Sequence, residues 1–289
     1  MGLLWVILAD SALGAAPPPI VGGTPEENGA VVLLVVSDQN GDATAVCSGS
    51  RLDPWTILTA AHCVLPGAGF VPARVQVVAA ESRSAATGGN TVDAEDWWVH
   101  PDYDEATATF DVALLRLSEA SDGEQLPLLR DAPREADLGD PVELVGFGAV
   151  GDQDANADPS RRSARAPLYD FDDAALFTWD DAGVVNACFG DSGGAMLVPG
   201  EDGRLALAGV IGFVSLCEGG STGGARSDQI LPWIRETATP EEAERPPVEA
   251  EDTGIHPPGE CACGGGAAGP LGWGLAGLFA VGRGRRRTR

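Results

Sequence analysis

The chain contains no lysine, and its 18 basic residues, all arginine, are far fewer than its 43 acidic residues. Five of the arginines lie in the last seven positions, so residues 1–282 carry 13 positive charges against 43 negative ones, a balance of −30. A body with this charge repels phosphate backbones. Nucleic-acid binding is therefore excluded as its main function.

Aromatic residues are also scarce, at 6% of the 289 residues, whereas glycine (39) and proline (21) are abundant. The apolar fraction of 44% is still enough to fill a sizeable core, which excludes wholesale disorder. Frequent turn-forming residues favour many short strands over long helices. The length fits one large domain or two small ones.

The N-terminus lacks a positive charge, yet residues 3–9 form a short apolar core that is followed by small residues. Asp10 interrupts the end of this core, which is too short to span a bilayer. We predict a signal peptide and a short pro-segment over residues 1–19, with a buried strand as the alternative. The chain is then exported, to the cell surface or the extracellular space.

Six cysteines, an even number, suit disulfides in an oxidising compartment, and they are Cys47, Cys63, Cys188, Cys217, Cys261 and Cys263. The last two lie with His256 in a Pro/Gly-rich tail that has no scaffold to fix tetrahedral geometry. We therefore expect no metal site and no cofactor.

The C-terminal region has a different composition from the rest of the chain. Residues 237–260 are acidic and proline-rich, which predicts a disordered, extended linker. Residues 261–289 comprise two cysteines, a Gly/Ala-rich apolar run over 264–282 and the terminal arginines. The run predicts a short apolar helix near the length of a membrane span, with the arginines on the cytoplasmic side.

This tail resembles the MYXO-CTERM class of bacterial sorting tags over about its last 30 residues. The resemblance implies surface display, sorting machinery as a partner, and cleavage or modification near Cys261 or Cys263. The alternatives are a plain membrane anchor and a disordered end without an address.

The body, residues 20–236, contains short apolar runs separated by turn-forming residues. The runs predict strands over residues 30–36, 56–60, 75–79, 112–117, 142–145, 195–198 and 205–210. Residues 230–237 predict a closing helix that has Pro232 in its first turn.

Three residues in this body suit acid–base and nucleophilic chemistry. His62 follows an apolar strand directly, and Asp111 interrupts an apolar run, where a carboxylate needs a hydrogen-bond or charged partner. Ser192 lies among glycines that allow a tight turn exposing its hydroxyl group. Each has an ordinary alternative: a structural histidine, a solvent-facing loop aspartate and a simple glycine turn.

Four motifs occur in order along the body: IVGG at 20–23, TAAHC at 59–63, DVALLRL at 111–117 and GDSGG at 190–194. With these motifs the chain resembles the trypsin/chymotrypsin-like serine protease family over residues 20–236. The resemblance implies an all-β fold of two antiparallel six-stranded β-barrels with a C-terminal helix. It also implies a monomer whose active site lies between the barrels.

The resemblance assigns roles to these residues. Ser192 would be the nucleophile, His62 the general base and Asp111 the residue that orients the imidazole. The backbone N–H groups of Gly190 and Ser192 would form the oxyanion hole. Disulfides would join Cys47 to Cys63 and Cys188 to Cys217.

Activation in this family requires a new N-terminus. An ammonium group on Ile20 would pair with buried Asp191 and order the oxyanion loop. Pro19 stands where trypsin-activated relatives carry Arg or Lys, so a different activating peptidase is expected.

The specificity pocket by resemblance contains Asn186 at its base and Val214 and Thr222 on its walls. Without a carboxylate at the base, cleavage after Arg or Lys should be poor. Gly212 and Phe213 replace the family's usual Ser and Trp, which removes a hydroxyl partner of Asp111 and should reduce activity.

These observations predict a serine endopeptidase that acts on proteins or peptides through an acyl-enzyme, after small or medium uncharged residues. The alternatives are a catalytically weakened, protease-shaped surface binding module and an anchored esterase that uses the same triad.

Overall fold

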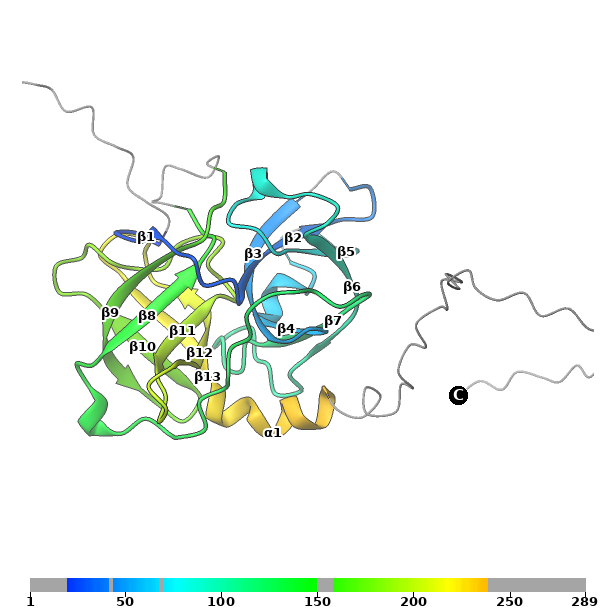
Figure 1. The fold of residues 1–289 in the computed structure, drawn as a ribbon. Coiled ribbons are helices and arrows are strands. Elements are labelled where there is room, and N and C mark those ends of the chain that lie inside the picture. The colour runs from blue at the N-terminus through cyan, green and yellow to red at the C-terminus, as the bar shows by residue number, and fades with distance from the viewer. Residues whose placement is uncertain (1–19, 42–43, 68–69, 150–157, 239–289) are drawn as a thin grey trace, which may run out of the picture. The chain divides into compact units, whose positions relative to one another are not determined.

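The structure is a computed structural model, and it describes residues 20–41, 44–67, 70–149 and 158–238 (Figure 1). The predicted signal peptide, the sorting tail and all of the predicted linker except Thr237 and Ala238 lie outside these residues. Within the described ranges, no helix is both long and apolar enough to cross a membrane.

The first six barrel strands form a closed antiparallel barrel in the order β2-β3-β4-β7-β6-β5. Strand β2 is buried along its whole length because its sequence, VVLLVVS, is almost entirely apolar. The strands are β2 Val31–Ser37, β3 Thr44–Asp53, β4 Thr56–Thr59, β5 Arg74–Val78, β6 Thr91–Val99 and β7 Ala113–Leu117.

The remaining strands close a second antiparallel barrel in the order β8-β9-β10-β13-β12-β11, with β8 pairing back to β9. A short strand, β1 Thr24–Pro25, pairs with β9 at its edge. The all-β prediction of two six-stranded barrels is confirmed. The strands are β8 Pro141–Gly146, β9 Arg162–Phe171, β10 Ala175–Trp179, β11 Ala195–Pro199, β12 Leu205–Val214 and β13 Ser221–Arg226.

Every apolar run predicted as a strand is a strand, with ends shifted by at most four residues, whereas β1, β3, β6, β9, β10 and β13 were not predicted. The unpredicted β9 alternates buried with exposed positions and carries Arg165 and Asp170 on its outside. Strand β13 contains two consecutive glycines, which have no side chains to form an apolar run. A Cβ atom at Gly223 would lie 2.1 Å from the Phe213 ring, so close packing requires this glycine.

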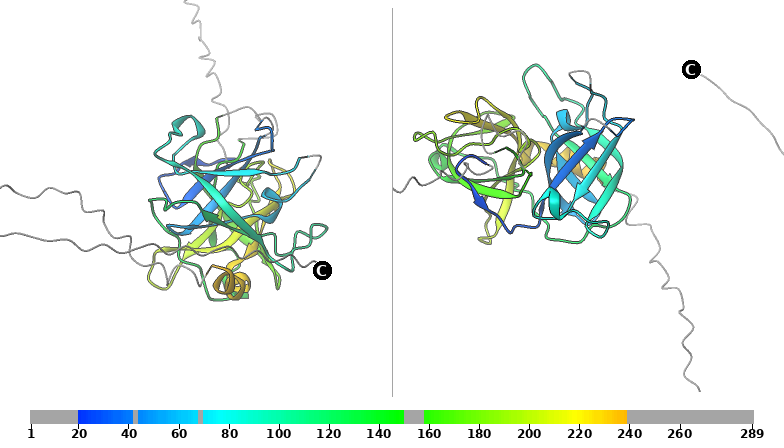
Figure 2. Two further views of the ribbon diagram at one scale, coloured as in Figure 1. Left: turned by 90° about the vertical axis from the view of Figure 1, so that its right-hand side faces the viewer. Right: turned by 90° about the horizontal axis from the view of Figure 1, so that it is seen from above.

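The C-terminal helix α1 spans Ser227–Thr237 and begins three residues earlier than predicted. The Ser227 hydroxyl donates to the Leu129 carbonyl, and Asp228 lies in the first turn, where acidic side chains favour a helix start. Pro232 consequently lies in the second turn, so its predicted first-turn position is wrong. The Trp233 ring meets the His100 ring edge-on at 4.9 Å, so α1 reaches from the second barrel to the first (Figure 2).

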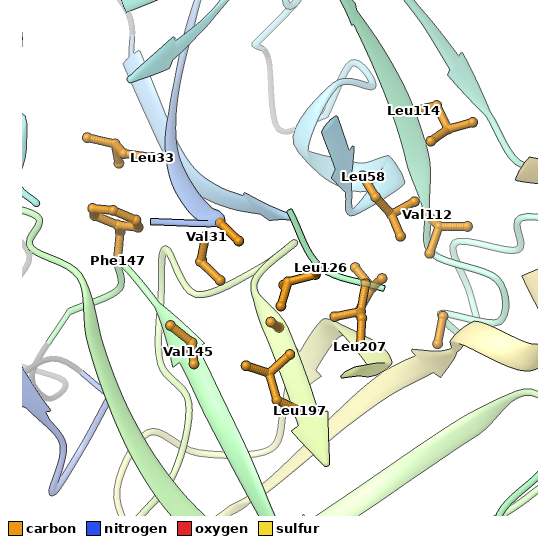
Figure 3. Close-up of a cluster of buried hydrophobic side chains, with 14 of the residues drawn as sticks. Val31, Leu33, Leu58, Val112, Leu114, Leu126, Val145, Phe147, Leu197 and Leu207 are labelled. Carbon is orange, nitrogen blue, oxygen red and sulfur yellow. The ribbon is translucent and has the colours of Figure 1, made fainter. Parts of the chain in front are cut away.

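A shared hydrophobic core joins the two barrels (Figure 3). Val31 and Leu33 of the first barrel belong to one buried cluster with Phe147, Leu197 and Leu207 of the second half. Separate clusters fill the interior of each barrel. The barrels therefore form one packed body, which fixes the edges that carry the candidate site.

Candidate active site

His62 and Asp111 are brought together by neighbouring strands of the first barrel. His62 lies in a 3-10 helical turn, Ala61–Cys63, which begins two residues after the end of β4, and Asp111 lies two residues before the start of β7. Because Thr59 of β4 pairs with Ala113 of β7, both side chains emerge at the same barrel edge.

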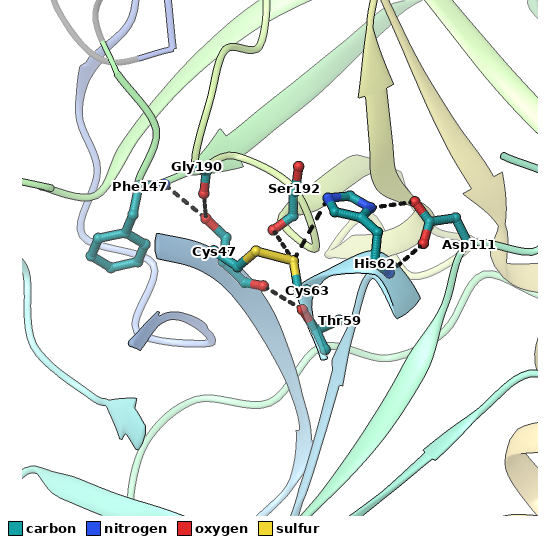
Figure 4. Close-up of a disulfide and its surroundings, with 9 residues drawn as sticks. Cys47, Thr59, His62, Cys63, Asp111, Phe147, Gly190 and Ser192 are labelled. Carbon is teal, nitrogen blue, oxygen red and sulfur yellow. Dashed lines mark hydrogen bonds and ion pairs between the residues drawn. A yellow bond between two sulfur atoms is a disulfide. The ribbon is translucent and has the colours of Figure 1, made fainter. Parts of the chain in front are cut away.

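The carboxylate of Asp111 holds the imidazole of His62 at two points. Its Oδ2 lies 2.6 Å from Nδ1, and its Oδ1 accepts a 3.0 Å hydrogen bond from the backbone N–H of His62 (Figure 4). The Asp111 side chain is only 3% exposed, whereas that of His62 is 39% exposed. A proton on Nδ1 leaves the Nε2 lone pair free, which is the tautomer a general base needs.

The loop that carries Ser192 depends on two glycines with positive φ, Gly190 (99°) and Gly193 (82°). A Cβ at Gly193 would lie 2.2 Å from the Ser48 carbonyl oxygen, so only glycine fits there. Within the described part of the chain, the N–H groups of Gly190 and Ser192 donate to no acceptor, whereas that of Asp191 bonds the Cys188 carbonyl. The two free donors are those expected to form the oxyanion hole.

Ser48, which the sequence reasoning missed, attaches this loop to the first barrel. Its hydroxyl donates to the Gly190 carbonyl and accepts from the Phe147 N–H, both at 2.9 Å. Its backbone N–H donates to the Ser192 carbonyl at 2.8 Å. Ser48 is fully buried, and its only sequence signal is its position beside Cys47.

Ser192 and His62 both contact the Cys47–Cys63 disulfide of the first barrel. The Sγ atom of Cys63 lies 3.9 Å from His62 Nε2 and 3.8 Å from the Ser192 carbonyl oxygen (Figure 4). Among the described residues, no hydrogen bond joins Ser192 Oγ to His62 Nε2. Such catalytic bonds are often long in the free enzyme and tighten when substrate binds.

Two disulfides are present, Cys47–Cys63 and Cys188–Cys217, the same pairs that the resemblance implies. Each is expected to stabilise the folded state by about 3 kcal/mol. Cys47, His62 and Cys63 lie within metal-ligating distance of one another, but both sulfurs are in the disulfide and no thiolate is available.

Asp191 is fully buried in a shell of backbone donors. Its carboxylate accepts from Gly148 N at 2.7 Å and from Cys188 N at 2.8 Å. Burial raises the pKa of Asp191 to about 7, more than these hydrogen bonds lower it. Within the described residues no cation pairs with this carboxylate.

Ile20, the expected partner of Asp191, is also fully buried, in the core cluster of the second barrel. The next residue, Val21, forms a β-bridge with Asn186, at the predicted base of the specificity pocket. In the continuous chain the nitrogen of Ile20 is an uncharged amide. The structure therefore places the expected new N-terminus inside the second barrel without the charge that would pair with Asp191.

The three predicted pocket residues come together, in an arrangement that satisfies their polar atoms. The Thr222 hydroxyl donates to the Asn186 side-chain carbonyl, and the Asn186 amide donates to the Leu216 backbone. Val214 of β12 is the cross-strand partner of Thr222 of β13. Both polar side chains are almost fully buried, and neither carries a charge.

Two packed antiparallel barrels, with a His–Asp pair on one and a glycine-framed serine on the other, define the architecture of a two-barrel serine protease. The chain matches the trypsin family over residues 20–234 and belongs to that family.

Curated relatives share this region at low identity. The chain is 26% identical to the human "Chymotrypsin-like elastase family member 3A" over 238 residues, which cover 69% of this chain and 81% of that protein. It is 28% identical to a "Trypsin" of Saccharopolyspora erythraea over 170 residues, or 54% of this chain and 72% of that protein. "Proproteinase E" of Bos taurus is 26% identical, covering 69% and 86%.

Proposed function

We propose that the protein is a serine endopeptidase that hydrolyses peptide bonds through an acyl-enzyme. Ser192 Oγ attacks the scissile carbonyl while His62 Nε2 takes its proton and then returns it to the leaving amine. Asp111 holds the imidazole and stabilises its charged form. The observation that carries this proposal is the 2.6 Å contact between Asp111 and His62, which leaves Nε2 free.

The Gly190 and Ser192 N–H groups are proposed to stabilise the oxyanion of the tetrahedral intermediate. Their lack of acceptors in the described chain supports this role, because an oxyanion hole needs donors that are already oriented and unused. Each donor is expected to lower the barrier by about 3 kcal/mol.

The pocket at Asn186, Val214 and Thr222 favours small or medium uncharged residues before the scissile bond. Its support is the hydrogen bond between Asn186 and Thr222, which leaves no carboxylate or unpaired polar group at the base. An arginine inserted there would lose its hydration without gaining a charged partner.

The proposal extends to maturation and location. Export through the N-terminal segment agrees with the two disulfides, since such bonds persist in oxidising compartments. A peptidase other than trypsin would cut after Pro19, and the new Ile20 ammonium would pair with Asp191. The C-terminal tail would then anchor or sort a monomeric protease at the cell surface.

Cleavage of peptides by processed protein tests the activity. The full chain is produced with a specific processing site directly before Ile20, cut, and incubated with a peptide library whose products are identified by mass spectrometry. We expect cleavage after Ala, Ser, Thr or Val, and none with Ser192→Ala. Equal cleavage by that variant would contradict the proposal.

A protease-shaped binding module is the second candidate. It is favoured by the missing bond between Ser192 Oγ and His62 Nε2 in the described chain and by Gly212, which offers Asp111 no hydroxyl. A processed protein that cleaves no peptide or ester but binds cells or surface polymers, unchanged by Ser192→Ala, would establish it. Cleavage of esters alone would indicate the esterase instead.

A further inference from the structure

A pocket of about 370 Å³ lies on the second barrel, apart from the proposed triad. Three aromatic side chains and one carboxylate line it, and we call these four residues the aromatic subsite: Tyr169, Asp170, Phe177 and Trp179. Tyr169 is 59% exposed and Trp179 is 40% exposed, an unusual display in a chain so poor in aromatic residues. Exposed aromatic groups gathered around a cavity indicate ligand recognition more than core packing.

The pairing of β9 with β10 places side chains of the aromatic subsite on one face of the sheet. Asp170 of β9 lies directly opposite Phe177 of β10, so the two side chains project on the same face of the sheet. A β-bulge follows, because the next pair is Leu168 with Thr178, and Tyr169 is the extra residue. Its ring meets that of Trp179 edge-on, at 5.6 Å and 72°.

Asp170 is the one charged residue among those that line the pocket. Asp170 Oδ1 accepts a hydrogen bond from the Phe171 N–H, and among the described residues no group donates to Oδ2. Asp172 and Asp173 follow on the same hairpin, and among the residues that line the pocket none is basic. Aromatic faces beside a carboxylate suit a cation with a flat or apolar stem.

The end of β12 runs from the proposed triad to the aromatic subsite. A Cβ on Gly212 would lie 3.3 Å from Asp111 Oδ2, and the next residue, Phe213, contacts Phe177 at a ring distance of 5.9 Å. Ser215, three residues beyond Gly212, lines the pocket. Three residues of extended chain span roughly 10 Å, so the subsite lies within reach of one substrate.

A free edge of strand β12 connects the proposed triad with the aromatic subsite. The last pair between β12 and β11 is Val210 with Ala195, and Ile211 bonds Gly194, whereas β13 pairs with β12 on its other side as far as Val214. Within the described chain, nothing pairs with the first edge beyond Ile211. An extended peptide can add to such an edge through its backbone and present alternate side chains to adjoining pockets.

We propose that the aromatic subsite binds an arginine side chain of the substrate, about three residues before the residue whose carbonyl Ser192 attacks. The inference rests on the proposed endopeptidase function. The guanidinium stacks on the aromatic faces and meets Asp170 Oδ2, a contact that an uncharged side chain cannot make. The enzyme would thus reject arginine in its uncharged primary pocket and select it at this second place.

Binding to the Ser192→Ala full chain, processed at Ile20, tests the subsite without cleavage. Two peptides are compared that differ only in arginine or norleucine three residues before a cleavage-site alanine. Binding is followed by tryptophan fluorescence, and Trp179→Phe identifies the signal of that residue. We expect the arginine peptide to bind roughly tenfold more tightly, and Asp170→Asn to remove the difference.

Asp173→Asn is the matched control, because it removes the same charge from the hairpin without touching the pocket, and it should keep the arginine preference. Equal binding of both peptides, or equal loss in both variants, would overturn the subsite. If the processed wild-type chain cleaves neither peptide while the Asp170-dependent preference persists, the endopeptidase proposal fails and the subsite stands.

Discussion

The two halves of the candidate active site are held in different ways. In the first barrel, His62 and Asp111 are already joined by two short contacts to one buried carboxylate. In the second barrel, the Ser192 loop depends on glycine conformations and on buried Asp191, which lacks a cation in the described chain. The comparison teaches that the His62–Asp111 pair is complete in the continuous chain, so the proposed processing at Ile20 would act on the Ser192 loop.

The largest expected effect on activity comes from a substitution in the His62–Asp111 pair of the first barrel. Asp111→Asn keeps the shape of the side chain but removes the charge that selects the proton-bearing nitrogen of His62. We expect kcat of the processed protein on a cleaved peptide to fall by roughly 10⁴-fold. Thermal unfolding of the variant is the control, and an activity loss below tenfold would contradict the role of Asp111 in orienting His62.

Asp191→Asn changes the Ser192 loop of the second barrel. It should lower the activity of the processed protein but raise the stability of the unprocessed chain. In the processed protein it removes the partner of the new ammonium and disorders the oxyanion donors. We expect kcat to fall by roughly 10²–10³-fold, the size of a lost oxyanion donor. In the unprocessed chain the same substitution removes an uncompensated buried acid and should raise the urea midpoint. A fall in both forms would contradict the assignment of Asp191 as the activation partner.

The pH dependence of stability separates the two forms of the chain. Burial raises the pKa of Asp191 to about 7, so the folded unprocessed chain keeps a proton that the unfolded chain releases near pH 4. Its stability contribution is complete below pH 4 and is lost as the pH rises to about 7. We expect the unfolding equilibrium constant to rise roughly tenfold per pH unit across this window.

Urea titrations from pH 4 to 8 measure this trend, with Asp191→Asn as the reference that lacks it. Processed protein should show the trend weakly, because the Ile20 ammonium favours the ionised carboxylate. Identical profiles for the unprocessed chain and the variant would show that Asp191 has no raised pKa.

The smallest effect on activity should come from an added hydrogen bond to Asp111. Gly212 lies beside Asp111, so Gly212→Ser places a hydroxyl within reach of Oδ2. We expect kcat to rise by about two- to fivefold, the scale of one added hydrogen bond. Gly212→Ala, which adds the Cβ without the hydroxyl, is the matched control and should not raise kcat.

The sequence predicted the two-barrel architecture through its ordered motifs and identified the apolar strands through their composition. It did not reveal β9 and β13, because one alternates charges on its outer face and the other uses glycines that make room for Phe213. Ser48 was missed for a similar reason. Its role comes from contacts 142 and 99 residues away along the chain, to Gly190 and Phe147, which no local pattern records.

The aromatic subsite shows the same limit. Its residues come from β9 and β10, and the turn between β12 and β13 completes the pocket around them. A bulge that only the strand register reveals makes Tyr169 the extra residue. Asn186 and Thr222 could be named from the motif resemblance, but their mutual hydrogen bond joins the segment after β10 to β13, a contact that no local pattern records.

Covalent labelling of Ser192 tests the central claim most directly. The full chain with Ile20 as its first residue is treated with a fluorophosphonate, and the modified peptide is identified by mass spectrometry. An adduct on Ser192 that disappears in His62→Ala is the predicted result, because the imidazole is needed to activate the hydroxyl group. An unlabelled Ser192 in correctly processed, folded protein would contradict the account.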